Sequence, residues 1–356
     1  MLGRVAAGTM TVAVALAVPA AAHGATKEVS AGPFAKQKQF EKALGDGNEY
    51  YRRTVTVHKG DKVKWTINGF HSVTFVPKGE DPPPLVLPLA NSPVTDSRDV
   101  EGNLFWFNNQ PNLAFNPLAA TPQGGKKLKS GKLTSSGLPL AEGRPKPYTL
   151  KFPKTGTFTY LCTVHPGMVG QVRVVGAKKD IPSAKQDKKA AKAQLAGTLG
   201  EVKRLSAGEG LNLQNTIQAG NDRLSGATVY KFFPASATFK VGSTVTLQMA
   251  PTTSEVHTFT FGPSNGKDLY VDQLVGSLLG PVFDPRGIYP SENPTAGVPS
   301  YTPRLHGNGF WNSGFLDGTD ASPLPASTQI RFAEAGTFSF ICLIHPFMHA
   351  EVTVTP

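Results

Sequence analysis

Alternation of apolar and polar residues predicts short β-strands in both halves of the chain. In the first half, residues 50–57 and 62–66 alternate, and Lys59-Gly60-Asp61 supplies turn residues between them. In the second half, residues 237–241 and 244–249 repeat this plan. The pattern therefore predicts a similar β-sheet architecture in each half.

One segment between the halves has a helical composition. Residues 183–196 are rich in Ala, Lys and Gln, they follow Pro182, and Ser183 is placed to act as the N-cap. Gly197 is expected to end this helix. We interpret residues 179–207 as a short basic helical linker.

Length and composition fit two β-domains on either side of this linker. The chain has 356 residues, which is enough for two cores. Its 30 prolines and 37 glycines favour sandwiches with many turns over helical bundles. We therefore predict an all-β protein with one sandwich domain at residues 26–178 and a second at residues 208–356.

A stretch of thirteen residues occurs twice, at 156–168 and at 336–348, and the copies match at seven positions. Each copy begins as an alternating, aromatic-rich run, which is typical of a β-strand. Each then presents Cys, His and Met within seven residues, as the strand gives way to a loop that contains Pro. The stretch is an internal repeat, and it carries the two cysteines of the protein.

A thiolate, an imidazole and a thioether on one loop form a soft ligand set that suits copper better than calcium or magnesium. A trigonal His₂Cys site with a weak axial Met needs one more His. One His precedes a Val/Thr/Phe-rich strand upstream of each copy, so each half contains a complete set. The two sets are His71, Cys162, His165 and Met168, and His257, Cys342, His345 and Met348.

On these motifs, each half resembles a cupredoxin of the plastocyanin/amicyanin type. The loops Cys162-Thr-Val-His-Pro-Gly-Met168 and Cys342-Leu-Ile-His-Pro-Phe-Met348 are similar to the short amicyanin-like version of the copper loop. The resemblance implies two Greek-key β-sandwiches, one type 1 copper ion in each, and one-electron transfer. It also implies that Ser72 and Thr258, next to the upstream histidines, bridge the two ligand loops around each copper.

The resemblance further implies that the C-terminal His of each set, His165 or His345, reaches the surface and acts as the electron exit. The loops differ in bulk next to the Met, where Gly167 aligns with Phe347. Because bulk and polarity around copper change its potential, we expect two distinct potentials.

Three alternatives bear on these residues. The two cysteines of an exported chain could form a disulfide, but a disulfide requires no His and Met at fixed spacing after each Cys. Copper nitrite reductases and small laccases are two-domain cupredoxins too, but they carry a His beside the type 1 Cys. Here Leu161 and Ile341 precede the cysteines, Thr163 and Leu343 follow them, and no His-x-His pair occurs, so we expect no enzyme. Copper storage or delivery is the alternative function to electron transfer.

Long stretches separate the upstream His from the Cys, with 91 residues from His71 to Cys162 and 85 from His257 to Cys342. Within them Gly102-Asn-Leu-Phe-Trp106 is echoed by Gly307-Asn-Gly-Phe-Trp311. The tryptophans are expected to pack in a core. The alternative is that these aromatic loops fold over the copper-bearing end and shield it or form a docking face.

The N-terminus predicts export. A basic start, an apolar run to Ala22 and small residues at 20–22 are typical of a secretory signal over residues 1–25, although an uncleaved signal anchor is an alternative. We expect a secreted or periplasmic protein. The net charge of +11 favours an acidic redox protein or an anionic envelope surface as partner, with peripheral membrane association as a further option. Nucleic acid is not expected.

Overall fold

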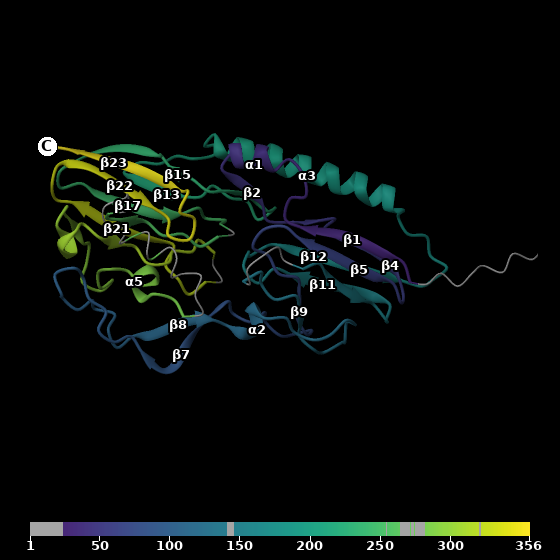
Figure 1. The fold of residues 1–356 in the computed structure, drawn as a ribbon. Helices are drawn as coiled ribbons and strands as arrows, with labels where there is room; N and C mark the ends of the chain where they lie inside the picture. Colours follow the sequence, from purple (N-terminus) through teal and green to yellow (C-terminus); the bar gives the residue numbers. More distant parts are fainter. Residues whose placement is uncertain are drawn as a thin grey trace, which may run out of the picture.

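The computed structural model describes residues 24–140, 146–253, 255–263, 271, 274, 282–319 and 322–356 (Figure 1). Residues 1–23 of the predicted signal sequence lie outside the described residues. Among the described helices, none combines the length and the hydropathy needed to cross a membrane.

The first half forms a β-sandwich of two mixed sheets. Its strands are β1 (Thr26–Ala31), β3 (Tyr50–Tyr51), β4 (Thr54–His58), β5 (Lys62–Ile67), β6 (Thr74–Phe75), β9 (Thr134–Ser135), β10 (Tyr148–Lys151), β11 (Gly156–Leu161) and β12 (Val169–Val175). One sheet has the order β10-β5-β1-β3 and the other β4-β12-β11-β6-β9. The predicted turn at Gly60 joins β4 to β5, which lie in opposite sheets, and Trp65, Tyr160 and Phe152 fill the space between.

The second half repeats this sandwich. Its strands are β13 (Thr216–Ala219), β15 (Phe232–Phe233), β16 (Ser236–Lys240), β17 (Thr244–Met249), β18 (Thr260–Phe261), β19 (Ser300–Tyr301), β20 (Trp311–Asn312), β21 (Ser327–Phe332), β22 (Gly336–Ile341) and β23 (His349–Thr355). The sheets have the orders β15-β13-β17-β21-β19 and β16-β23-β22-β18-β20. The parallel pairs also match between the halves. The pair β1–β5 corresponds to β13–β17, and the pair β4–β12 corresponds to β16–β23. The predicted all-β fold with two Greek-key sandwiches is confirmed.

The helix between the sandwiches, α3 (Ala184–Ser206), is longer than predicted and is packed. Ser183 caps it with the predicted geometry, but Gly197 does not end it. Glycine costs a helix about 1 kcal/mol relative to alanine. Burial of one face offsets this cost, because Leu195, Leu199 and Val202 pack with side chains of both halves, including Phe40 of α1 (Gln37–Lys42). The prediction that the helix ends at Gly197 was therefore wrong.

A two-stranded ribbon joins the halves beneath this helix (Figure 1). It consists of β2 (Gly45–Gly47) and β14 (Ala227–Val229), which pair antiparallel with Asp46 opposite Thr228. The offset of 182 between Asp46 and Thr228 equals that between Tyr50 and Phe232, which occupy matching places in β3 and β15. Each strand therefore pairs with its own counterpart, as at the two-fold axis of a symmetric dimer.

The long stretches before the cysteines meet in a second apolar cluster that both halves share. They contain β7 (Val86–Pro93), β8 (Pro111–Phe115), α2 (Pro117–Ala120), α5 (Pro285–Ile288) and the 3₁₀ turn η1 (Leu305–Gly307). Figure 1 shows β7 and β8 beside α5. The cluster combines Phe105 and Phe107 of the first half with Phe283, Ile288 and Phe310 of the second.

The two echoed tryptophans have different places. Trp311 is 2% exposed in the core of the second sandwich, as expected for a core residue. Trp106 packs at the edge of the shared cluster, and its Nε1 donates a hydrogen bond of 2.8 Å to the Pro290 carbonyl of the other half. The first aromatic loop thus makes a contact between the halves.

Candidate metal centres

Each repeated loop is closed by the same two backbone hydrogen bonds. The N–H of Cys162 donates to the carbonyl of Met168 at 3.0 Å, and the N–H of Met168 donates to that of His165 at 3.1 Å. In the second loop, the equivalent distances are 3.1 and 2.7 Å. Strands β11 and β22 end one residue before each Cys, so the loop carries the ligands away from a fixed strand end.

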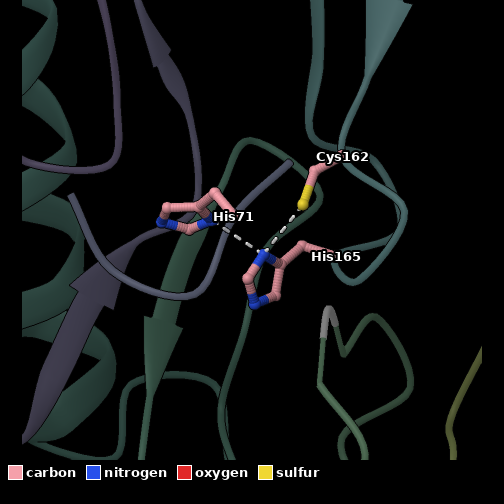
Figure 2. Close-up of side chains that lie close together, drawn as sticks. All are labelled: His71, Cys162 and His165. Carbon is pink, nitrogen blue, oxygen red and sulfur yellow. Dashed lines mark hydrogen bonds between the residues drawn. The ribbon is translucent and has the colours of Figure 1, made fainter. Parts of the chain in front are cut away.

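In the first set, Nδ1 of His71 lies 2.9 Å from Nδ1 of His165, and Sγ of Cys162 lies 3.4 Å from the same Nδ1 of His165 (Figure 2). The three side chains are almost completely buried. Residues that are far apart in the sequence thus bring three donor atoms to one point, as predicted.

The second set has the same arrangement. Nδ1 of His257 and Nδ1 of His345 lie 3.1 Å apart, and Sγ of Cys342 lies 3.6 and 3.8 Å from them. In both sets the donor atoms lie within 4.8 Å of one another. Both thiols are free and lie in different sandwiches, so the disulfide alternative is wrong.

Met168 and Met348 are buried in the same apolar clusters as their cysteines. Their role as axial ligands stays a prediction.

Ser72 and Thr258 lie where the resemblance placed them. The backbone N–H groups of Ser72 and Thr258 each point to a cysteine sulfur at 3.4 Å. The Ser72 hydroxyl accepts a 2.9 Å hydrogen bond from the N–H of Thr163, and the Thr258 hydroxyl accepts one of 2.8 Å from the N–H of Leu343. Each hydroxyl therefore ties the upstream ligand segment to the cysteine loop.

Glu255 is a site residue that the sequence analysis missed. Its Oε1 lies 3.0 Å from Nε2 of His165, and its Oε2 lies 3.8 Å from Nε2 of His345. The carboxylate is buried, and Asn48 and Tyr230 donate to Oε1 at 2.9 and 3.1 Å. The only signal in the sequence is an acidic residue two positions before His257.

This contact corrects the expectation that the C-terminal histidine reaches the surface for His165, whereas His345 is partly exposed. His165 is 4% exposed, and its Nε2 meets the carboxylate of the other half instead of solvent. The ring of His345 packs against that of Tyr230, with centroids 4.7 Å apart. The expectation failed because it treated each sandwich alone, whereas here the two ligand loops face each other.

The upstream histidines have a different environment. In the described part of the chain, Nε2 of His71 and Nε2 of His257 are buried without a hydrogen-bond partner. Gly32 leaves room for the His71 ring, since a Cβ there would lie 2.7 Å from Nε2 of His71, and its φ of +81° favours glycine.

The electrostatic surroundings of the two thiols differ. Burial opposes ionisation of Cys162, but the charge of His165 and hydrogen bonds to His165 and His71 outweigh it and bring its pKa well below the usual value. Burial dominates at Cys342 and raises its pKa. The pKa of His165 is well above its usual value because Glu255 and Cys162 outweigh burial. Burial and the neighbouring His345 lower the pKa of His257 to about 3.

The donor atoms of both sets fit a soft metal ion. When Nε2 of a ring carries its proton, Nδ1 presents a lone pair, and two facing lone pairs near 3 Å repel unless a cation lies between them. Two imidazole nitrogens and a thiolate are the equatorial ligands of blue-copper sites. The residues present therefore fit copper.

Comparison with known proteins gives limited similarity. No protein-family model matches the chain, and no curated protein matches it. Among solved structures, a reduced Cu(I) amicyanin is similar at 18% identity, over 42% of this chain and 82% of that one, with a TM-score of 0.22. Oxidised plastocyanin from Dryopteris crassirhizoma is similar at 16% identity, over 39% of this chain and 99% of that one, with a TM-score of 0.21. With scores this low, the fold assignment rests on the strand orders above.

Proposed function

We propose that this chain is an exported copper protein that holds one type 1 copper ion in each sandwich and transfers single electrons. One observation carries the proposal: the same cluster of two Nδ1 atoms and one Sγ occurs twice, at matching places in two sandwiches. When bound, copper supplies the Cu(I)/Cu(II) couple. The proposed ligands are His71, Cys162, His165 and Met168 in the first site and His257, Cys342, His345 and Met348 in the second.

The protein's own groups favour this use. The N–H groups of Ser72 and Thr258 point at the sulfurs and stabilise negative charge on them. The ligand segments are fixed to each other by the Ser72 and Thr258 hydroxyls, so the donor atoms have little freedom to reorganise. The three donors of the first set and two of the second, His257 and Cys342, are buried away from water.

The proposed partners follow from charge. The net charge of +11 would steer an acidic redox protein, or an anionic envelope surface, toward the molecule. We propose electron transfer without catalysis in a secreted or periplasmic location.

Copper storage or delivery is the second candidate, and the burial of His165 favours it at the first site. His165 offers no open ligand edge for rapid electron exchange with a partner, whereas the His345 side chain is 14% exposed. Copper that stays bound through repeated oxidation and reduction would support the carrier function. Copper that leaves on each reduction or oxidation would support delivery.

The direct test is an anaerobic Cu(II) titration followed by visible absorption and metal analysis. We expect an intense blue thiolate-to-copper band that saturates at about two equivalents, one per His₂Cys set. The variants Cys162→Ala and Cys342→Ala should each lose one equivalent and keep the other. Absence of the band in all three proteins would overturn the proposal.

A further inference from the structure

Glu255 lies between the two ligand sets and contacts both. Its two oxygens face the Nε2 atoms of His165 and His345, at 3.0 and 3.8 Å, and these histidines belong to different sandwiches. The shorter distance is a hydrogen bond, and the longer one is within ion-pair range. One buried carboxylate therefore contacts a candidate ligand of each of the two metal centres.

The surroundings of Glu255 follow the pseudo-symmetry of the molecule. Its donors Asn48 and Tyr230 are 182 residues apart, the offset that relates β2 to β14, so matching positions of the two halves hold the same oxygen. The carboxylate itself has no counterpart. Gly69 stands two residues before His71, with φ of +98°, and a side chain there would lie 3.2 Å from Nε2 of His71. The second half alone supplies the bridging group.

We propose that Glu255 is a shared positioning residue that sets the tautomer of both His165 and His345 and thereby couples the two ligand sets. The inference rests on the proposed function, because it assigns these histidines as ligands. A carboxylate only accepts hydrogen bonds, so Nε2 of His165, at 3.0 Å, carries a proton, and Nε2 of His345, at 3.8 Å, faces the same acceptor within ion-pair range. In a neutral imidazole that has its proton on Nε2, Nδ1 keeps the lone pair that faces the other donors of its set.

The variant Glu255→Gln distinguishes control of the histidine tautomers from simple packing. Glu and Gln have the same shape, but Gln offers one acceptor oxygen and one NH₂ donor. Its oxygen can accept from one Nε2–H, and its NH₂ then faces the other Nε2, which must give up its proton. That histidine takes the opposite tautomer, with a proton on Nδ1, where no lone pair is left for a metal.

The first measurement follows the histidine ring nitrogens by long-range ¹H–¹⁵N NMR in the reduced full-length protein without added metal. In the wild type we expect a proton on Nε2 of both His165 and His345. In Glu255→Gln one of the two should lose it, and in Glu255→Asp, which keeps two acceptor oxygens, both should retain it. A wild-type His165 without a proton on Nε2 would overturn the proposal even if the variants fail to fold.

The second measurement is Cu(I) affinity by competition with a chelator. Groups that orient a ligating histidine contribute about 10–100-fold in metal affinity. Glu255→Gln should therefore weaken one site by about 10–100-fold. The matched control is Glu49→Gln, which also removes a buried carboxylate between the halves. Among the described residues, Glu49 hydrogen-bonds to Arg53, Gln194 and Thr198 and to no histidine, so both affinities should stay unchanged.

The outcomes distinguish this inference from the proposed function. If Glu255→Gln keeps both Nε2 protons and both Cu(I) affinities, the shared role is wrong while the copper sites stand. If the wild type gives no blue band with Cu(II), the proposed function fails, and the NMR measurement still decides which tautomers Glu255 sets.

Discussion

The two ligand loops have the same motif and the same backbone hydrogen bonds, but they meet different surroundings. Gly167 in the first loop faces the other half, and a Cβ there would lie 3.4 Å from Leu224. Phe347 in the second loop is 52% exposed and packs edge-on against Tyr230, beside a groove that Leu44 and His349 also line. The first loop thus contacts the other half through Leu224, whereas the second borders an open groove.

This difference comes from residues beside the ligands and not from the ligands themselves. Glu255 lies closer to His165 than to His345, and the pKa of Cys162 is lowered while that of Cys342 is raised. The repeated motif therefore specifies the same donor set twice. The contact between the halves gives the two sets different electrostatic surroundings.

We expect the largest difference in stability between the halves at the two echoed tryptophans, Trp311 and Trp106. Trp311→Ala removes a fully buried side chain from the second core, and such a change costs about 3–5 kcal/mol of the free energy of unfolding. Trp106→Ala removes a partly exposed ring and one hydrogen bond, at about 1–3 kcal/mol. Chemical denaturation of both variants checks the order, and equal losses would contradict the different placement of the two rings.

Exchanging the residues Gly167 and Phe347 between the loops should reduce stability in the first loop more than in the second. Gly167 has φ of +84°, so Gly167→Phe places a bulky residue in the left-handed region against Leu224, at a cost of about 1–3 kcal/mol. Phe347→Gly removes an exposed ring and should change stability less. It should instead move the potential of the second site toward that of the first, as protein-film voltammetry of single-site Cys variants would show. Coincident potentials before the exchange would contradict two distinct sites.

A smaller effect concerns a contact between the halves away from the metal sites. Nδ1 of His306 lies 3.2 Å from Oδ2 of Asp99 in the first half, and its Nε2 lies 2.8 Å from Oε1 of Glu292. Burial lowers the pKa of His306, but its bonds to Glu292 and Asp99 outweigh burial and raise it above the usual value. The contact should therefore stabilise the fold fully below about pH 6.5 and lose this contribution as pH rises through the raised pKa.

Thermal unfolding of the wild type and His306→Gln across this range measures the contribution. We expect the wild type to be more stable below pH 6.5, by about 1 kcal/mol or less, and the difference to shrink as pH increases. A difference that stays constant with pH would show that the imidazolium charge plays no part.

Sequence reasoning reached the parts of this structure that depend on local pattern. The strands around Gly60, the cap at Ser183 and the ligand sets follow from alternation, turn residues and a repeated spacing. The roles of Ser72 and Thr258 were expected from the resemblance to cupredoxins, which assigns them to the residues next to the upstream histidines. These features are set by neighbours in the sequence or by a motif that occurs twice.

The parts that were missed depend on contacts between the halves. Helix α3 continues past Gly197 because both halves cover one of its faces. His165 is hidden because the ligand loops face each other, and Glu255 becomes a site residue only in that arrangement. The role of His306 likewise requires Asp99 from the other half. No periodicity in a single sequence encodes such contacts.

The central claim is that two copper centres face each other across Glu255. Pulsed electron paramagnetic resonance of the fully oxidised, Cu(II)-loaded protein tests it most directly, with Cys162→Ala and Cys342→Ala as single-site references. We expect a dipolar modulation between two Cu(II) ions in the wild type that is absent from both variants. A wild-type signal equal to the sum of the two single-site signals, without dipolar modulation, would contradict it.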